Sequence, residues 1–262
     1  MSIYRIYAII IRYGIVGFRE LNRLMQIIDF PLLDIALWGY MGLWMQKSSS
    51  NPHILMTYLA ARVLWSAVWT VEIEFSMNLL EEFESRNFIN LVSTPLKHAE
   101  WIIGNTILGF GKSLLVVLMS SLVAYLIFGL NVFSLGFGII PLILSIIFSG
   151  LVLGLFLTGI LLRGGQQIAV LIWSIPYLIL TFSAPFYPAN ILPTWIQPIV
   201  KALPTTHIFE SLRGLINNGI IAQKSLFISF GLNALFLLVA VLFNYAMLIQ
   251  SKKRGLVHVE QE

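Results

Sequence analysis

Residues 135–162 read LGFGIIPLILSIIFSGLVLGLFLTGILL, and this stretch contains no charged residue. A helix that crosses the hydrocarbon core of a bilayer needs about 20 mostly apolar residues, so the stretch predicts a long transmembrane helix that could tilt. Within it, Gly150 and Gly154 form a GxxxG pair, which lets a second helix approach closely. Five further segments predict spans in the same way, although Lys112 interrupts one of them. The six predicted spans are approximately residues 28–46, 53–76, 103–128, 135–162, 167–184 and 225–250.

The composition of the whole chain agrees with a membrane protein. Hydrophobic residues make up 58% of the 262 residues and charged residues 11%, and the mean hydropathy is +0.87. Soluble domains are typically about 45–50% apolar and about 25% charged. The net charge of +4 lies mainly beside the apolar runs, where it sets orientation and does not indicate a nucleic-acid partner. The absence of cysteine excludes disulfides and thiolate metal sites. We therefore predict an all-α membrane protein with a single membrane domain over residues 1–262.

The basic residues predict which side of the membrane each loop faces, because cytoplasmic loops carry an excess of Lys and Arg. With the N-terminus inside, the outer side holds only Lys47, Lys201, Arg213 and Lys224. We predict that both termini are cytoplasmic, with which an even number of spans is consistent, and that the protein lies in the cell (inner) membrane of a bacterium or archaeon. The residues assigned to the cytoplasmic side are Arg5, Arg12, Arg19, Arg23, Arg86, Lys97, Arg163, Lys252, Lys253 and Arg254.

Residues 1–26 differ from a spanning segment because arginines recur along them. Arg5, Arg12, Arg19 and Arg23 are separated by 7, 7 and 4 residues, so they fall on one narrow face of a helix. This pattern predicts an amphipathic helix over residues 3–25 in the membrane interface, with its arginines among lipid headgroups. The alternative is a frayed start to the first span. The arginines also interrupt the apolar run that a cleavable signal peptide needs.

The loop 77–102, on the predicted cytoplasmic side, is too long to be a simple turn, and loops of this length are usually functional. Apolar residues at helical spacing predict a short amphipathic helix in it. Pro95 predicts a corner after this helix, because the residue before a proline disfavours helical geometry. A rigid acidic helix exposed to the cytosol would dock a partner protein, and the alternative is a solvated charged turn. The charged residues of the loop include Glu81, Glu82, Glu84 and Arg86.

The second span carries one polar and aromatic stripe. Ionisable groups inside a membrane are costly and usually face protein or water, so the stripe predicts a face towards the bundle interior or a translocation path. The alternative is that Arg62 and Glu72 simply reach the two membrane interfaces from opposite ends of the helix. The stripe consists of Tyr58, Arg62, Trp65, Trp69, Glu72 and Ser76, at steps of 4, 3, 4, 3 and 4.

The fifth span has a small hydroxylated face. Ser174, Tyr177 and Thr181 are spaced for one side of a helix, and Pro176 predicts a kink because it removes a backbone donor. This face could line a path or could pack against another helix, since Ser and Thr serve both purposes.

The segment 185–224, on the predicted outer side, combines prolines with large apolar residues. An ordinary water-exposed loop would not hold so many apolar side chains, whereas short helices dipping back into the outer leaflet would, if protein covers their backbone ends. Glu210 and Arg213 are three residues apart on a predicted helix and could pair. The apolar residues are Ile191, Leu192, Trp195, Ile196, Ile199 and Leu203.

The chain lacks the motifs of a nucleotide site or a hydrolase. Gly111-Lys112-Ser113 resembles the end of a phosphate-binding loop, but Thr106 stands where its first glycine belongs. The histidines lack metal-ligand spacing, and no HExxH or GxSxG occurs. We expect no catalytic residue, no metal and no cofactor bound by this chain.

Taken in order, the interfacial helix, the acidic inner loop and the proline-rich outer segment resemble an ABC transporter permease of the type-2 exporter class. The resemblance spans nearly the whole chain. The start of the first span, residues 30–34 with Trp38, is nearer to drug or lipid exporters than to polysaccharide exporters. The resemblance is carried by Glu81 through Pro95 followed by Glu100 and Gly104, and by Phe186-Tyr187-Pro188 with Leu192-Pro193-x-Trp195, Pro204 and Glu210-x-x-Arg213.

This resemblance implies a permease homodimer that joins two copies of a separate ATP-binding subunit, which would hold ATP and Mg. The substrate would be a lipid, a drug or a glycan-type molecule. The inner loop would be a coupling helix seated in the ATPase, acting together with the N-terminal helix. The first and fifth spans would lie near the dimer interface, and the second and fifth near the path. The outer segment would form re-entrant helices that close the translocation path.

The residues to which these roles extend fall into three sets. The implied ATPase-coupling residues are Glu81, Glu82, Arg86, Asn87 and Pro95. The residues expected along the translocation path are Arg62, Trp65, Trp69, Glu72, Ser174, Tyr177 and Thr181. The implied outer gate consists of Tyr187, Pro188, Pro193, Trp195, Pro204, Glu210 and Arg213.

Two other classes of protein stay open from the sequence. One is an ion-coupled secondary transporter that uses Glu72 and Arg62, and the other is an intramembrane enzyme or scramblase. Stable co-purification with an ATPase would favour the exporter. Transport driven by a proton gradient without any partner would favour the secondary transporter.

Overall fold

The computed structural model describes residues 1–19, 21–49 and 51–253, with the backbone alone at residues 18, 21–24 and 26–31. Over this part of the chain every regular element is a helix and no strand is present. The predicted all-α class is therefore confirmed. The side chain of Arg23, the fourth arginine of the predicted interfacial face, lies outside the described residues.

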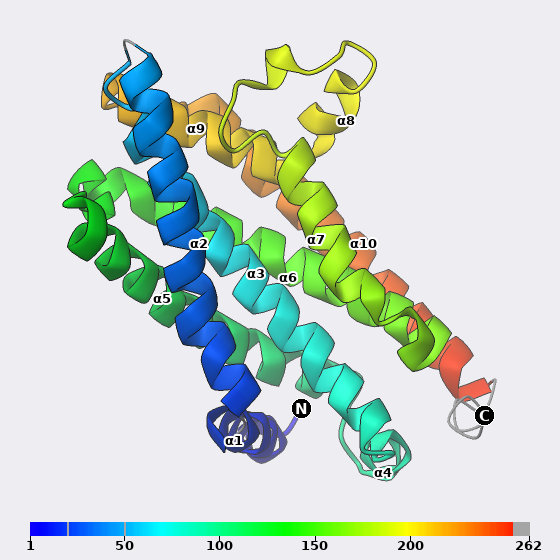
Figure 1. Ribbon diagram of the computed structural model, residues 1–262. Helices are drawn as coiled ribbons and strands as arrows, with labels where there is room; N and C mark the ends of the chain where they lie inside the picture. Colours follow the sequence, from blue (N-terminus) through cyan, green and yellow to red (C-terminus); the bar gives the residue numbers. More distant parts are fainter. Residues whose placement is uncertain (20, 50, 254–262) are drawn as a thin grey trace.

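Six helices of the described chain run alongside one another as a bundle (Figure 1). Four of them, namely α3, α5, α10 and α6 with its flanking turns, are long and apolar enough to cross a membrane. The other two predicted spans correspond to α2 and α7, which are not among the candidate spans found in the described residues, and α7 has only 13 residues. The six-span arrangement therefore stays a prediction. The bounds are α2 Leu21–Ser48, α3 Ile54–Glu84, α5 His98–Phe128, α6 Ile139–Gly164, α7 Val170–Phe182 and α10 Gln223–Lys253.

The shorter elements gather at the two ends of this bundle (Figure 1). At the end that we call the α1–α4 end lie α1 (Ile3–Arg19), α4 (Phe88–Ser93) and the described C-terminal end of α10. At the other end, the α8–α9 end, lie η3, α8 and α9. The bounds of these and of the two turns that flank α6 are η3 Ala189–Ile191, α8 Gln197–Ala202, α9 Pro204–Asn218, η1 Val132–Gly138 and η2 Gly165–Ile168.

Two predicted boundaries at the α1–α4 end are wrong. The N-terminal helix was expected to continue to residue 25, but α1 ends at Arg19 and α2 begins at Leu21 as a bundle helix. The acidic residues were expected on a separate helix, but α3 continues to Glu84 and carries them in its last turns. Buried apolar residues keep recurring to the end of α3, through Phe83, so the helix has packing partners well beyond the predicted span.

The short helix of the loop is α4, which lies later in the chain than predicted. It ends at Ser93, and the next residue, Thr94, is extended with ψ 159°. This geometry is the one expected before Pro95, whose ring disfavours helix in the preceding residue. The predicted corner at Pro95 is therefore present, although the helix before it has only six residues.

The core of the bundle is the contact between α3 and α6, and two glycines allow it. A methyl group on Gly150 would lie 2.9 Å from the carbonyl oxygen of Val68, and one on Gly154 would lie 3.0 Å from Cβ of Phe75. Any larger side chain at either position would push the two helix backbones apart. The close contact that the GxxxG pair predicts is confirmed.

Buried polar side chains join α6 to α10. Asn233 donates to the carbonyl oxygen of Ser145 at 2.9 Å and accepts from Ser149 at 2.9 Å. Asn244 donates to the carbonyl oxygen of Leu155 at 2.8 Å and to Thr158 at 2.7 Å. In lipid there is no general hydrophobic force between helices, so hydrogen bonds of this kind help to hold the pair together.

Replacing Gly150 by alanine should destabilise the protein, because the new methyl group meets the α3 backbone. Overpacking of this kind typically costs about 1–3 kcal/mol. The matched control is Gly111→Ala, since a methyl group at Gly111 in α5 meets no atom within 4 Å. Thermal unfolding midpoints of the purified proteins in one detergent test the pair. Equal midpoints for the two variants would contradict the packing described here.

Candidate functional site

At the α1–α4 end, the buried carboxylate of Glu82 binds groups from two other segments. Glu82 is 1% exposed and lies in the last turns of α3. Arg12 of α1 lies 2.6 Å from its Oε1, and the Tyr13 hydroxyl donates to the same oxygen at 2.8 Å. The side-chain amide of Asn87, in the turn before α4, donates to Oε2 at 2.7 Å. One carboxylate therefore attaches α1 and the turn before α4 to α3.

Tyr13 is placed to remain a hydrogen-bond donor. Burial raises the pKa of Tyr13, and the neighbouring Glu82 carboxylate raises it further. The hydroxyl therefore keeps its proton and donates to Glu82. It also accepts a hydrogen bond from the indole nitrogen of Trp101 at 3.2 Å, which brings α5 into the same cluster.

A second carboxylate fixes the other end of the loop. Glu100, with no exposed surface, accepts from the backbone N–H of Lys97 at 2.9 Å and from that of Ser2 at 2.7 Å. Arg5 of α1 lies 3.6 Å from it and donates to the carbonyl oxygen of Pro95 at 2.5 Å. Glu82 and Glu100 thus hold α1 against both ends of the loop that carries α4.

These contacts give two of the N-terminal arginines partners within the protein. Arg5 and Arg12 were predicted among lipid headgroups, but in the structure they bind Glu100 and Glu82. The pattern of arginines along one helical face was correct, and carboxylates of the same chain lie opposite part of that face. Arg19 is exposed.

The predicted coupling residues divide into buried and exposed members. Glu82 and Asn87 meet in the hydrogen-bonded cluster, Pro95 meets Arg5, and Glu81 is half-buried. Arg86 is exposed and has φ +54°, a left-handed conformation that lets the chain reverse direction between α3 and α4. The exposed residues around α4 are Glu84, Ser85, Arg86, Ile89, Asn90, Ser93, Thr94 and Pro95.

The stripe on α3 faces protein along its length, but different neighbours cover its parts. Arg62 is buried, pairs with Asp34 of α2 through Nε at 2.6 Å, and lies 5.6 Å from the Trp38 ring centroid. Trp65 and Glu72 are buried in the core, and a methyl group on Gly154 of α6 would lie 3.3 Å from Cα of Glu72. The prediction that this face points into the bundle is confirmed for these three residues.

Glu72 is the least satisfied charged group of the stripe. Its side chain has no exposed surface. Ser76 donates to Oε1 at 2.7 Å, whereas Oε2 is buried without a hydrogen-bond partner. An incompletely paired carboxyl group in the core of a membrane helix is costly, which is why such residues are candidates for function.

Trp69 brings α7 into contact with α3. Its ring lies 5.8 Å from that of Trp173 and 5.2 Å from that of Tyr177. Tyr177 is 52% exposed, and Ser174 and Thr181 are exposed on the same side of α7. The buried residues of α7, Ile172, Pro176 and Leu180, lie on its opposite side. Within the described part of one copy of the chain, the hydroxylated face of α7 is therefore largely exposed, and Trp69 covers only part of Tyr177.

At the α8–α9 end, aromatic rings close the space between α2, α3 and the segment after α7. Phe186 stacks on Trp38 with centroids 4.4 Å apart and on Tyr58 with centroids 4.7 Å apart. Tyr187 donates to the carbonyl oxygen of Thr181 at 2.7 Å. Phe186 was part of the family signature in the sequence but was not among the predicted gate residues, and its aromatic neighbours could not be identified from spacing.

The predicted Glu210–Arg213 pair does not form. Arg213 donates instead to the carbonyl oxygen of Ala184 at 2.7 Å, and Ala184 has φ +50°. Glu210 lies 3.7 Å from Nδ1 of His207. Spacing on α9 brought the two residues within reach, but a sharply turned backbone beside Arg213 offers a closer acceptor.

The other predicted gate residues differ in exposure. Pro204 is buried and is the first residue of α9, a position that tolerates proline because its N–H would be unpaired anyway. Pro188, Pro193 and Trp195 are exposed, Trp195 at 74%.

A charged pair between α3 and α5 was missed by the sequence reasoning. Lys112 lies 2.5 Å from Oε2 of Glu74, and both are buried. Asn78 extends the cluster by donating to Glu74 at 3.1 Å and to Asn105 at 2.6 Å. The signal was present, since Lys112 interrupts one apolar run and Glu74 lies in another, and two opposite charges inside adjacent spans favour pairing. Within the described part of the chain, no group of three or more His, Asp or Glu side chains is placed to hold a metal ion.

Replacing Glu82 by glutamine should loosen α1, because Arg12 then loses its charged partner. Hydrogen bonds to charged groups contribute about 1.5–3 kcal/mol, and the share of Arg12 is reduced by its 41% exposure. We expect a loss of about 2 kcal/mol, which raises hydrogen exchange of the α1 amides about thirtyfold. The control is Glu84→Gln, which removes an exposed carboxylate two residues away. Unchanged exchange in Glu82→Gln would contradict the attachment.

Comparison with known proteins identifies the chain's family. The sequence model of the ABC-2 type transporter family matches residues 63–217, which is more than half of the chain. The match runs from the first half of α3 to the end of α9, so it includes Glu82, α4, α7 and the segment of Phe186. A direct comparison with curated proteins gives no match. The chain therefore belongs to the ABC-2 type transporter family and is an integral membrane permease of that family.

Proposed function

We propose that this chain is the permease subunit of an ATP-driven exporter, acting as a homodimer with two copies of a separate ATP-binding subunit. ATP and Mg bind to that partner, and the permease forms the path for a lipid, drug or glycan-type substrate. The six-span arrangement accompanies this proposal: α2 and α7 cross the membrane together with the four longer apolar helices. Both termini and the α1–α4 end then face the cytoplasm.

The observation that carries the proposal is the double attachment of the α4 loop. Glu82 fixes the start of the loop, Glu100 fixes its end, and α1 contacts both carboxylates. A partner that pushes on α4 therefore acts on α1, α3 and α5 together. A loop that served only as a connection would not need two buried carboxylates to fix its geometry.

The buried and exposed residues of this region take different parts. Glu82 and Asn87 hold the loop in place from inside, and the carbonyl oxygen of the exposed Pro95 is held by Arg5. Arg86 and its exposed neighbours offer the surface on which the ATP-binding subunit docks. Glu81 is half-buried beside that surface. The coupling set implied by the family resemblance thus contains both positioning and contact residues.

The translocation path lies where the hydroxylated face of α7 meets a second copy of the chain. Ser174, Tyr177 and Thr181 lie on that face, and Trp69 supports it from α3. Trp65 and Glu72 are buried within one copy, Glu72 against Gly154 of α6, and shape the path indirectly. The stacked Phe186 closes the α8–α9 end, supported by Tyr187 and Arg213.

A second candidate function rests on Glu72. A fully buried carboxyl group with one unpaired oxygen is the group that a proton-coupled transporter would use. This candidate predicts uptake or export driven by a proton gradient in vesicles that contain only this chain. The exporter predicts no transport there until the ATP-binding subunit and ATP are added.

Replacing Ile89 by aspartate should release the ATP-binding subunit, because Ile89 is a large apolar residue exposed on α4 at 40%. Loss of a central apolar contact in an interface costs about 2 kcal/mol or more, so the affinity should fall about thirtyfold. The control is Ile220→Asp, an exposed isoleucine beyond α9 at the opposite end. The measurement is co-purification of the tagged ATP-binding subunit with each variant. Loss of the subunit in Ile220→Asp instead, or in neither, would contradict docking at α4.

The homodimer can be tested by cross-linking, because the chain has no cysteine of its own. Tyr177→Cys should give covalent dimers with a short bifunctional thiol reagent in membranes, since α7 faces the second copy. Tyr125→Cys is the matched control, because Tyr125 on α5 is 55% exposed and Tyr177 is 52% exposed. Dimers from Tyr125→Cys as abundant as those from Tyr177→Cys would place the second copy elsewhere.

A further inference from the structure

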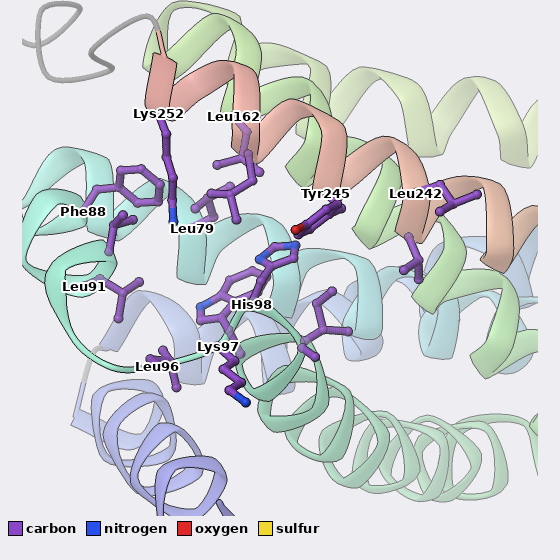
Figure 2. A pocket seen from close by; sticks show the side chains of 16 residues that line it. Leu79, Phe88, Leu91, Leu96, Lys97, His98, Leu162, Leu242, Tyr245 and Lys252 are labelled. Atoms are coloured by element: carbon purple, nitrogen blue, oxygen red, sulfur yellow. The ribbon is translucent and has the colours of Figure 1, made fainter. Parts of the chain in front are cut away.

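A pocket of about 640 Å³ lies at the α1–α4 end, between α4, the start of α5 and the ends of α3, α6 and α10 (Figure 2). Glu82 and Glu100 do not line it, although Lys97 and Trp101, which belong to their hydrogen-bonded clusters, do. It is separate from the exposed face of α7 and from the rings around Phe186, because neither segment contributes to its lining.

The lining of the pocket is hydrocarbon with a basic rim. Its walls include Leu79, Leu91, Leu162 and Leu242. Two charged residues line it, Lys97 and Lys252, and no carboxylate does. Figure 2 shows Lys252 extending from α10 towards Leu79 and Phe88, whereas Lys97, the residue before α5, lies at the other side of the pocket and points away from Lys252. The lining therefore suits a ligand with an apolar body and a negatively charged end.

One wall of the pocket is held in shape by hydrogen bonds. Nε2 of His98 on α5 lies 2.7 Å from Oδ1 of Asn244 on α10. The amide of Asn244 donates in turn to Thr158 of α6 at 2.7 Å. The His98 ring lies parallel to that of Trp101, with an interplanar angle of 6°. The space between α5 and α10 is thus fixed by three helices.

The length of the pocket matches one leaflet of a bilayer. Lys252 and Leu242 are ten residues apart on α10, which corresponds to about 15 Å along a helix. Half of a hydrocarbon core of about 30 Å is also about 15 Å. Leu242 and Tyr245 are 60% and 53% exposed, so the deep part of the pocket also opens sideways, where lipid surrounds the bundle.

We propose that this pocket binds an anionic phospholipid, with one acyl chain among the leucines and the phosphate beside Lys252. A protein side chain from the cytosol would meet the lysines but would not reach the sideways opening. Because Phe88 and Leu91 of α4 line the pocket, the bound lipid supports α4 from the side that faces the bundle. Only this last consequence rests on the proposed function. The binding itself does not require an ATP-binding subunit.

The experiment uses the full chain in nanodiscs that contain a photoactivatable phosphatidylglycerol with a diazirine on its acyl chain. A phosphatidylcholine with the same acyl chain is the comparison probe. We expect the anionic probe to label residues 88–92 and 241–248 several-fold more than the zwitterionic probe. Lys252→Gln should lower that labelling roughly fivefold, the effect of one lysine at an anionic surface. Lys253→Gln is the control, because Lys253 is exposed next to it but does not line the pocket.

The two probes on the unaltered chain keep the test independent of any variant's folding. Equal labelling by both probes would overturn the proposal, since it would mean that ordinary surrounding lipid enters the groove. Absence of labelling in these two segments would also overturn it. A chain that binds the anionic probe but recruits no ATP-binding subunit would leave the lipid site intact and would refute only the exporter.

Discussion

The α1–α4 end of the bundle depends on one interaction, the pairing of the buried carboxylate of Glu82. Glu82 lies 1% exposed at the end of a helix that is otherwise packed on all sides. A buried charge is tolerated only when it is paired and hydrogen-bonded. Its partners come from α1 and from the turn before α4, so pairing the charge also fixes where those two segments lie. Glu100 repeats the arrangement at the start of α5, with partners again from α1 and from the loop. Four helices are thereby held together at one end of the bundle by two carboxylates.

This arrangement fixes the position of α4 in the structure, which its own six residues could not do. So short a helix is not stable alone, because nucleation costs more than a few hydrogen bonds return. α4 is instead defined by the anchored residues on either side of it. At the same time its outer surface stays exposed, and the inner surface borders a pocket with a basic rim. The opposite end is closed differently, by the stacking of Phe186 on two aromatic rings.

The parts of this structure that follow from local pattern were predictable. Hydropathy located four spans, arginine spacing located the face of α1 that binds its partners, and the GxxxG pair marked the close contact between α3 and α6. What could not be predicted are the partners across long sequence separation. Periodicity shows that Arg12 lies on one face of a helix, but not that Glu82, 70 residues away, lies opposite it. The expected Glu210–Arg213 pair failed for a related reason, since the left-handed turn at Ala184 brings a backbone carbonyl to Arg213.

The central claim is that α1 and α4 move as one body when the ATP-binding subunit changes state. Cysteines at Ala8 of α1 and Asn90 of α4, both exposed, can be introduced into the cysteine-free chain and spin-labelled. The decisive measurement is the distance between the two labels in dimers with one labelled copy, without nucleotide and with ATP trapped. We predict that this distance stays the same, whereas in separate dimers labelled only at Asn90 of both copies the distance between the two labels changes. A change in the Ala8–Asn90 distance within one copy would show that α4 moves independently of α1 and would contradict the account.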